Sequence, residues 1–129
     1  LATDIDATIL SKARLGEYTE NDIKNVKKEY LDKYFAKQGD KYLIDDKIKK
    51  MVNFVKHDLI LDKYEKDFDL IVCRNVVIYF NQDVKNEIYE KFSGSLKKGG
   101  LLFVGATESI YNYKDFGFAK ASTFIYKKL

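Results

Sequence analysis

The stretch DFDLIVCRNVVIYFNQD, residues 67–83, holds two apolar runs that are separated by only two polar residues, Arg74 and Asn75. The first run, Leu70 to Cys73, is continuous and apolar, which is typical of a parallel strand covered on both faces. Arg74 marks the carboxyl end of that strand, where a cation is costly unless its charge reaches solvent or a partner. The second run, residues 76–80, returns the chain to the core. The stretch therefore predicts a buried strand that ends in a polar site, with an ordinary ion pair of Arg74 as the alternative.

Length and composition describe one globular domain. The chain has 129 residues, of which 46% are apolar and 33% are charged. No apolar run approaches the roughly 20 residues that a bilayer span needs, so we do not expect a membrane-embedded protein. Lysine and arginine exceed aspartate and glutamate by 23 minus 20, a net charge of +3, and they are interleaved with acids. This pattern disfavours nucleic acid as the main partner, including binding through the lysines of residues 24–50.

The chain has a single cysteine and a single histidine, which argues against a disulfide and against a metal site. Cys73 cannot form an internal disulfide, and no secretory leader precedes the predicted fold, so we expect a cytoplasmic protein. Because Cys73 lies in an apolar run with no obvious base beside it, we expect it to pack in the core. His57 has no second histidine or cysteine cluster to bind a metal with it, so no metal site is expected.

Strands and helices alternate along the chain. The predicted strands are residues 1–4, 41–45, 51–56, 69–73, 101–105 and 122–128, and the last can form a hairpin with residues 111–118. The predicted helices are residues 7–15 between Asp6 and Gly16, residues 21–35 with a capping box of Thr19 and Asp22, and residues 82–96 between Asn81 and the KKGG turn. This order predicts a mostly parallel α/β sheet with helices on both faces.

Polar residues follow four of the predicted strands, where ligands bind in sheets of this kind. They are Asp4 and Asp6, His57 and Asp58, Arg74 and Asn75, and Thr107 and Glu108. We expect these four strand ends to form one binding cleft, and this convergence is the main functional signal that the residues give by themselves.

Several of these residues have a structural alternative. Asp4 can accept hydrogen bonds from both hydroxyls of a ribose, or it can be a plain acid at a helix start. Asp58 can accept a hydrogen bond from an adenine amine while Leu59 packs on the ring, or the pair can be a loop acid and a core leucine. Tyr79 can be a core aromatic or can present its hydroxyl to the cleft. Glu108 can cap the following turn or line the same cleft.

At FDLIVCRNVVIYF, residues 68–80, the sequence resembles the CheR family of S-adenosylmethionine-dependent protein-glutamate methyltransferases. The resemblance also takes in ATDID, ILSKARLGEY, DKYF, VNFVKHDLI and SLKKGGLLFVGATES, in the same order, so it spans nearly the whole chain. It implies a truncated Rossmann-like methyltransferase sheet, mostly parallel with an antiparallel C-terminal strand. Residues 1–129 would then be one partial catalytic domain with a small subdomain-like insertion at about residues 17–50.

The resemblance implies methyl transfer from S-adenosylmethionine to glutamate carboxylates of methyl-accepting chemotaxis receptors. The products would be a methyl ester and S-adenosylhomocysteine, and no metal is expected. By position, the implied catalytic residues are Arg74 and Tyr79, which are similarly placed to the family residues beside the transferred methyl group. The implied cofactor-binding residues are Asp4 for the ribose, Asp58 and Leu59 for the adenine, and Arg74 and Asn75 of the conserved motif.

The chain departs from the family pattern in three places. The family usually has Asn where Asp58 stands, which adds a negative charge but keeps an acceptor for adenine. It has Pro at Lys98, a turn variation with little bearing on catalysis. It has a Gly-His-Ser-Glu run at residues 105–108, so this chain lacks a histidine that the family places in the cleft.

In the family, a helical domain and a first strand with a Gly-rich cofactor loop precede the position of Leu1. That strand lies between the strand ending at Asp4 and the strand ending at Arg74, so two strand edges would be unpaired without it. We expect aggregation, direct pairing of the flanking strands, or completion by another chain, including dimerisation by strand exchange. We also expect residues 1–129 alone to bind S-adenosylmethionine weakly or not at all and to be inactive.

Some family members dock a receptor-tail pentapeptide on a small β-subdomain with a Gly- and Arg-rich loop. The corresponding KQGDKYLIDDKIKK, residues 37–50, is lysine-rich and lacks arginine, so we expect no pentapeptide tether. The rival interpretation of the whole chain is a catalytically inactive methyltransferase-like module for sensing or protein interaction. Another dinucleotide enzyme of similar architecture also stays open on the residues alone.

Overall fold

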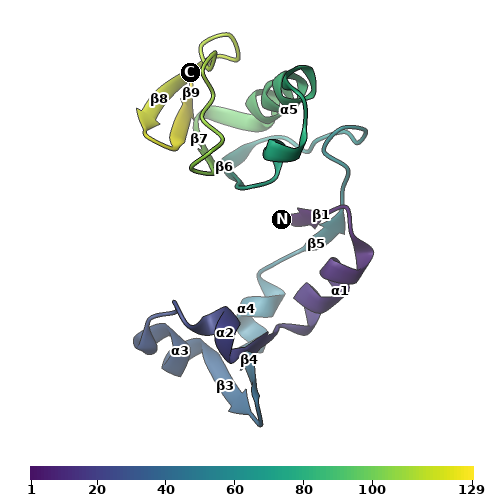
Figure 1. Ribbon diagram of the computed structural model, residues 1–129, viewed down its shortest axis with the longest axis vertical. Helices are drawn as coiled ribbons and strands as arrows, with labels where there is room; N and C mark the ends of the chain where they lie inside the picture. The colour runs from purple at the N-terminus through teal and green to yellow at the C-terminus, as the bar shows by residue number, and fades with distance from the viewer. The chain divides into compact units, whose positions relative to one another are not determined.

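The stretch that begins DFDLIVC contains the predicted strand, β6 (Phe68–Cys73), in a computed structural model that describes residues 1–129. The chain divides into two compact units, residues 1–58 and residues 59–129 (Figure 1). The prediction of a single domain with an insertion stays a prediction. None of the helices is long and apolar enough to cross a lipid bilayer.

A parallel strand pair and a helix open the first unit. β1 (Ala2–Asp4) pairs with β5 (Phe54–Lys56), and α1 (Ala7–Leu15) follows β1 directly. The Asp6 carboxylate accepts hydrogen bonds from the backbone N–H of Thr8 at 2.7 Å and of Ile9 at 3.4 Å, which caps the helix. The helix ends at Gly16, whose φ of 66° is left-handed. The predicted strand, cap and stop are confirmed.

A separate antiparallel sheet lies between α1 and β5. Its order is β2 (Glu17–Thr19), β4 (Lys41–Ile44) and β3 (Phe35–Gln38), and α4 (Asp46–Lys50) follows. β3 and β4 form a hairpin that turns at Gly39, where φ is 63°. The whole sheet lies within the range predicted as an insertion.

The single helix predicted over residues 21–35 is wrong, because the chain forms two short helices, α2 (Glu20–Ile23) and α3 (Lys28–Tyr34). The break lies at Lys27, whose φ of −59° and ψ of 141° are extended. Phe35 then leaves the helix and enters β3, where its ring packs edge-on against a tyrosine ring of β2 at 5.8 Å between centroids. Phe35 has the spacing of a helical residue in the sequence, but it packs in the sheet instead.

The second unit is built on a four-stranded mixed sheet of order β6-β7-β9-β8. β6 and β7 (Leu96–Val104) are parallel, and β9 (Ile125–Lys128) is antiparallel to both β7 and β8 (Phe118–Ser122). The closing strand is confirmed, but its hairpin partner begins at Phe118 and not at Tyr111 as predicted.

The connection from β6 to β7 contains the helix α5 (Gln82–Ser95). Asn81 caps it as predicted, since its side-chain oxygen accepts the Val84 N–H at 3.0 Å. The helix ends before Leu96, which pairs with Phe68 in the sheet. The next pair is Leu70 with Leu101, and the KKGG residues form the irregularity between the two pairs. Gly99 takes a φ of 82° there. The prediction of Gly99 as a turn residue is wrong, because it lies within β7 at the irregularity of the pairing.

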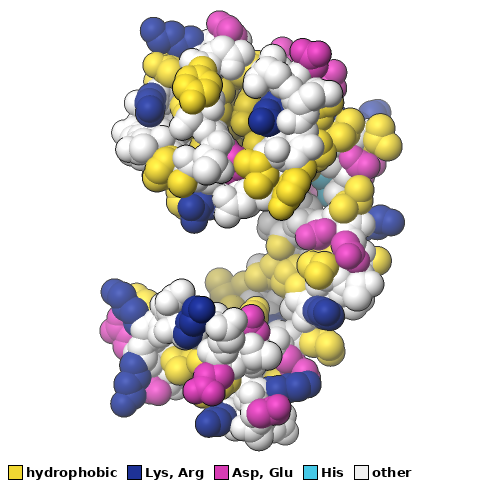
Figure 2. Space-filling view, in the orientation of Figure 1, with side chains coloured by type: hydrophobic (Ala, Val, Ile, Leu, Met, Phe, Trp, Pro, Cys, Tyr) yellow, Lys and Arg dark blue, Asp and Glu magenta, His cyan; other side chains and the backbone are white.

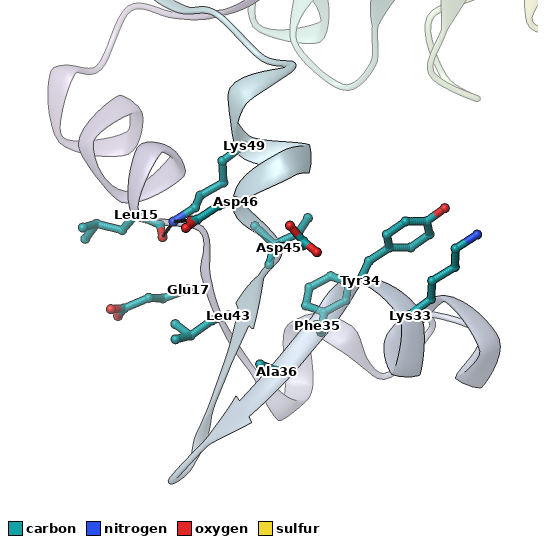
Figure 3. Close-up of a pocket in the computed structure, with 11 residues that line it drawn as sticks. Leu15, Glu17, Lys33, Tyr34, Phe35, Ala36, Leu43, Asp45, Asp46 and Lys49 are labelled. Carbon is teal, nitrogen blue, oxygen red and sulfur yellow. Dashed lines mark hydrogen bonds and ion pairs between the residues drawn. The ribbon is translucent and has the colours of Figure 1, made fainter.

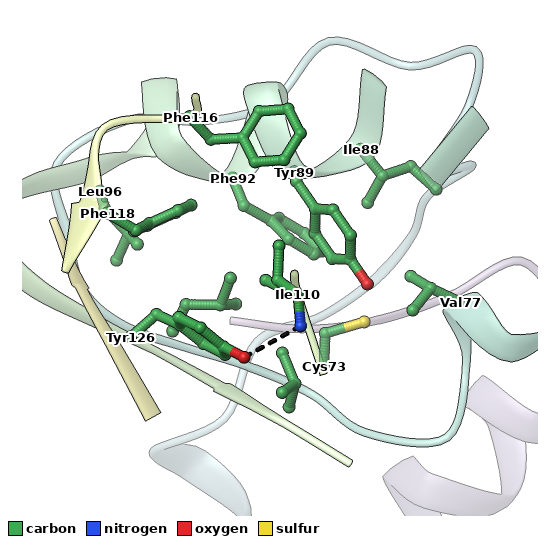
Figure 4. Packing of buried hydrophobic residues seen from close by; sticks show 12 residues of the cluster. Cys73, Val77, Ile88, Tyr89, Phe92, Leu96, Ile110, Phe116, Phe118 and Tyr126 are labelled. Atoms are coloured by element: carbon green, nitrogen blue, oxygen red, sulfur yellow. Dashed lines mark hydrogen bonds between the residues drawn. The ribbon is translucent and has the colours of Figure 1, made fainter. Parts of the chain in front are cut away.

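One face of this sheet is covered and holds the core (Figure 4). The largest fully buried side chains come from η1 (Val77–Tyr79), α5, β7, β8 and β9. They are Val77, Ile88, Leu102, Val104, Phe118 and Tyr126. The Tyr126 hydroxyl accepts the backbone N–H of Ile110 at 2.9 Å, so the one polar group of this set is satisfied.

The other face of β6 is exposed. Leu70 is 53% exposed and Val72 is 58% exposed, and Cys73 is the one buried residue of the strand. The prediction of a strand covered on both faces is therefore wrong for this chain. Alternate side chains of a strand point to opposite faces, and α5 covers only one of them.

The outer edge of β6 has no strand beside it, since β6 pairs with β7 alone. Within the first unit, β1 likewise pairs with β5 alone. The direct pairing expected for the two flanking strands stays a prediction. On the face shown in Figure 2, lysine and arginine side chains are interspersed with acids and do not gather into one basic patch.

Candidate active site

The loops that follow β6 and β7 meet on the side chain of Glu108. Because the two strands are parallel and adjacent, their carboxyl ends lie side by side. Glu108 is 4% exposed. Its Oε2 accepts the backbone N–H of Asn75 at 2.6 Å and of Gly105 at 2.7 Å. Its Oε1 accepts the N–H of Val76 at 2.9 Å and of Val77 at 3.0 Å. One carboxylate thus joins the two strand ends.

The backbone around this carboxylate is tightly specified. Asn75 adopts a φ of 61°, a left-handed conformation that asparagine tolerates better than most residues. Gly105 has no room for a side chain, because a Cβ there would overlap the Glu108 carboxylate and lie 2.6 Å from Asn75 Oδ1. The two residues therefore fit this turn for different steric reasons.

Arg74 lies at the exposed end of β6. Its guanidinium carbon is 4.8 Å from the centroid of the Phe103 ring on β7, a cation–π contact. Val72 pairs with Phe103 in the sheet, and Arg74 shares the face of Val72 because it is two residues further along. The charge therefore reaches solvent over an aromatic ring, and the ion pair considered as an alternative is not formed.

Tyr79 lies in η1 and is 80% exposed, while Val77 in the same turn is 1% exposed. The structure therefore excludes the core role for Tyr79. The second apolar run returns to the core through Val77, and Tyr79 stays at the surface of the second unit.

Asp4 ends β1 in the first unit. Its Oδ1 accepts the N–H of Asp6 at 2.8 Å, and its carbonyl accepts the N–H of His57 at 3.0 Å. The ends of β1 and β5 therefore lie side by side, with Asp58 one residue further on. Leu59 belongs to the second unit, where it packs against the core. The structure thus brings the predicted residues together in two groups, and their convergence into one cleft stays a prediction.

Cys73 is a core residue, as expected. Burial, with a smaller contribution from the negative charge of Glu108, raises the pKa of its thiol from 9.0 to about 12. Burial likewise raises the pKa of the Tyr89 phenol from 10.0 to about 12, with Glu108 again contributing. A thiol with such a pKa stays protonated at neutral pH and is a poor nucleophile.

A hollow of about 490 Å³ lies in the first unit (Figure 3). It contains none of the predicted site residues. Its charged groups are largely engaged with neighbours, since Lys49 pairs with Asp46 at 2.9 Å and Glu17 with Lys41 at 2.7 Å. Its lining comprises Leu15, Glu17, Lys33, Tyr34, Phe35, Ala36, Leu43, Ile44, Asp45, Asp46 and Lys49. We assign it no chemistry.

The residues at both groups of strand ends suit a nucleoside cofactor. The carboxylate of Asp4 ends a parallel strand, the position from which an acid reaches ribose hydroxyls in this class of sheet. Asn75 commits its backbone N–H to Glu108, so its side-chain amide and its carbonyl are the groups that it can offer to a ligand. The sequence left the role of Glu108 open and did not single out Phe103, which stands in the apolar residues of a predicted strand.

The sequence of the chain is similar to those of known methyltransferases. The family described as "CheR methyltransferase, SAM binding domain" matches residues 1–125. A chemotaxis protein methyltransferase of Listeria monocytogenes is 44% identical over 128 residues, which are 99% of this chain and 49% of that protein. Chemotaxis protein methyltransferases of Borreliella burgdorferi and Escherichia coli are 41% and 36% identical, over 99% and 84% of this chain and 46% and 40% of their own lengths. The chain thus spans about half the length of the curated relatives it matches.

The fold has a counterpart among solved structures. A TehB-like SAM-dependent methyltransferase from Corynebacterium glutamicum superimposes with a TM-score of 0.53 at 16% identity, over 97% of this chain and 63% of that one. This likeness shows the α/β methyltransferase fold, with parallel strands and an antiparallel C-terminal strand. Since the family match covers nearly every residue, from the strand that ends at Asp4 to the first residue of β9, the chain belongs to the CheR methyltransferase family, in the region of its S-adenosylmethionine-binding domain.

Proposed function

We propose that the natural protein that carries residues 1–129 transfers a methyl group from S-adenosylmethionine to glutamate side chains of methyl-accepting chemotaxis receptors, as part of sensory adaptation. Family membership and the names of the relatives support the methyl transfer and the chemotaxis context. The observation that carries the proposal is the exposed guanidinium of Arg74 at the end of β6, where a carboxylate can reach it. We place this reaction in the cytoplasm, where the single cysteine would stay reduced.

Five residues would hold the cofactor, whose sulfonium group supplies an electrophilic methyl. They are Asp4 at the ribose, Asp58 and Leu59 at the adenine, and Arg74 and Asn75 at the end of β6. No step of this chemistry requires a metal. S-adenosylhomocysteine would be the second product.

The substrate carboxylate needs no general base. A glutamate side chain has a pKa of about 4.3 and is ionised at neutral pH. Catalysis then depends on aiming one oxygen and removing its water, and orientation of this kind can lower a barrier by roughly 7 to 11 kcal/mol. A guanidinium can hold a carboxylate through two parallel hydrogen bonds, which is the task that we assign to Arg74. Tyr79 is exposed and lies five residues after Arg74, and its hydroxyl would donate a further hydrogen bond to the substrate carboxylate.

Receptor methylation by the Arg74→Ala variant of the natural protein tests this assignment. We expect a loss of about a hundredfold or more in methylation rate, because the substrate oxygen is no longer aimed. Arg74→Lys keeps the charge but not the planar fork, so we expect only partial activity. Lys98→Ala removes the same charge from an exposed position in β7 and is the matched control. An Arg74→Ala rate within a few fold of normal would show that the assignment is wrong.

Turnover also separates an enzyme from an inactive module. If the natural protein binds S-adenosylmethionine but transfers no methyl group to any receptor, the sensing or interaction role is favoured instead. For residues 1–129 by themselves we propose weak or no cofactor binding and no activity. Calorimetric titration that gave micromolar affinity for this piece would contradict that part of the proposal.

A further inference from the structure

Glu108 is a buried acid that the proposed chemistry has not used. We propose that Glu108 is a positioning residue of the methyl-transfer site, whose carboxylate holds the backbone turn at Arg74 and Asn75 so that the Arg74 side chain is aimed at the substrate. The inference rests on the proposed function of Arg74. It gives Glu108 no contact with the substrate or the cofactor.

The first support is that backbone N–H groups occupy all the hydrogen-bond acceptor sites of the Glu108 carboxylate. An ionised carboxylate has about four acceptor sites, and four backbone N–H groups, two on each oxygen, occupy them here. Converging peptide N–H groups of this kind form an anion-binding nest, which replaces the water that the charge loses on burial. An apolar side chain of equal size would fill the space but would leave four N–H groups without acceptors. The charge is therefore specific to this turn and is not a by-product of packing.

The second support is which backbone the carboxylate holds. Three of the four donors are the consecutive residues 75–77, directly after Arg74. Their N–H groups all point at the same carboxylate because Asn75 is left-handed. That conformation is unfavourable by itself, and the hydrogen bonds stabilise it. Glu108 thus sets the direction in which the chain leaves Arg74.

The third support is that the other end of Arg74 is also held. Its guanidinium lies over the Phe103 ring, which the sheet places on the same face. The side chain is therefore fixed at its backbone by Glu108 and at its charged group by Phe103. A loss of the carboxylate frees the first of these two ends.

A double-mutant cycle between Glu108→Gln and Arg74→Ala tests the inference in the natural protein. Glutamine keeps the shape but offers one oxygen, and its amide nitrogen faces backbone donors. We expect Glu108→Gln to lower the kcat of receptor methylation, per folded molecule, by about tenfold to a hundredfold. If Glu108 acts through Arg74, the same substitution lowers the residual rate of Arg74→Ala by less than about twofold, because coupled residues are not additive. Glu90→Gln, on the exposed side of α5, is the matched control and should stay near wild type.

Each outcome of the cycle decides something. Equal losses in both backgrounds, or a Glu108→Gln rate near wild type per folded molecule, would overturn the inference and leave the proposed function standing. If the Arg74→Ala variant methylates the receptor at the wild-type rate, Arg74 does not have the proposed role, and this inference is wrong as well. Folded fractions come from urea unfolding of each variant. If Glu108→Gln does not fold, Glu108→Asp replaces it in the same cycle, since it keeps the charge and shortens the reach.

Discussion

Glu108 Oε2 accepts the backbone N–H of Asn75 at 2.6 Å, although 33 residues separate the two along the chain. Their contact exists because β6 and β7 are parallel neighbours and end at the same edge of the sheet. It joins the loop after β6 to the loop after β7, at the place where the cofactor and the substrate are proposed to meet.

Substitution of Gly105 should disturb this turn. A Cβ at Gly105 overlaps the Glu108 carboxylate and lies 2.6 Å from Asn75 Oδ1, so we expect Gly105→Ala to lower the free energy of unfolding by about 1–3 kcal/mol. Gly94 in α5 is the control, because a Cβ there meets nothing within 4 Å. Gly94→Ala should raise stability by about 0.5–1 kcal/mol, since alanine favours helix. Urea unfolding of both variants measures this, and equal changes would refute the steric account.

The stability of the second unit should fall at alkaline pH. Burial raises the pKa of Cys73 from 9.0 to about 12 and that of Tyr89 from 10.0 to about 12. Between these values the unfolded chain has lost protons that the folded chain keeps, so the free energy of unfolding decreases as pH rises. The loss begins near pH 9 and is complete once pH passes 12.

Cys73→Ala isolates the thiol in this pH dependence. The variant will be less stable at pH 8 because it leaves a small cavity, but its stability should fall less steeply between pH 9 and pH 11 than that of the wild type. Urea unfolding at several pH values gives the two slopes. Identical slopes would mean that Cys73 is not protected from ionisation in the folded state.

Gly16 and Gly39 should differ in their tolerance of alanine. Both have positive φ, 66° and 63°, so alanine carries a strain of about 1–2 kcal/mol at either position. At Gly16 the Cβ would also lie 2.7 Å from Ile44 Cγ2, whereas at Gly39 it would meet nothing within 4 Å. We expect Gly16→Ala to cost about 1–3 kcal/mol more than Gly39→Ala in urea unfolding. A Gly39→Ala cost as large as that of Gly16→Ala would contradict this packing.

A receptor-tail pentapeptide should not bind the segment 37–50. Its charged groups are lysines and aspartates, and it has no arginine to form a planar fork with a peptide carboxylate. We expect calorimetric titration of the natural protein with such a peptide to give no measurable heat of binding at micromolar concentrations. Low-micromolar affinity would show that lysines suffice for this recognition.

The sequence by itself determined the local elements of this protein. The caps at Asp6 and Asn81, the capping box of Thr19 and Asp22, and the left-handed Gly16 were all predictable, because each depends on side chains and backbone groups within three residues. The parallel strand β6 and the polar residues at its end were predictable for the same reason, since their pattern is contiguous.

Only the tertiary structure decided the rest. The role of Glu108 depends on donors 31 to 33 residues away, and no spacing rule connects them. The exposure of Leu70 and Val72 depends on which face of β6 a neighbouring element covers, which an apolar run does not specify. The end of α3 before Phe35 arises because Phe35 joins a sheet instead of extending the helix. In each case contacts between distant segments outweighed the local preference of the chain.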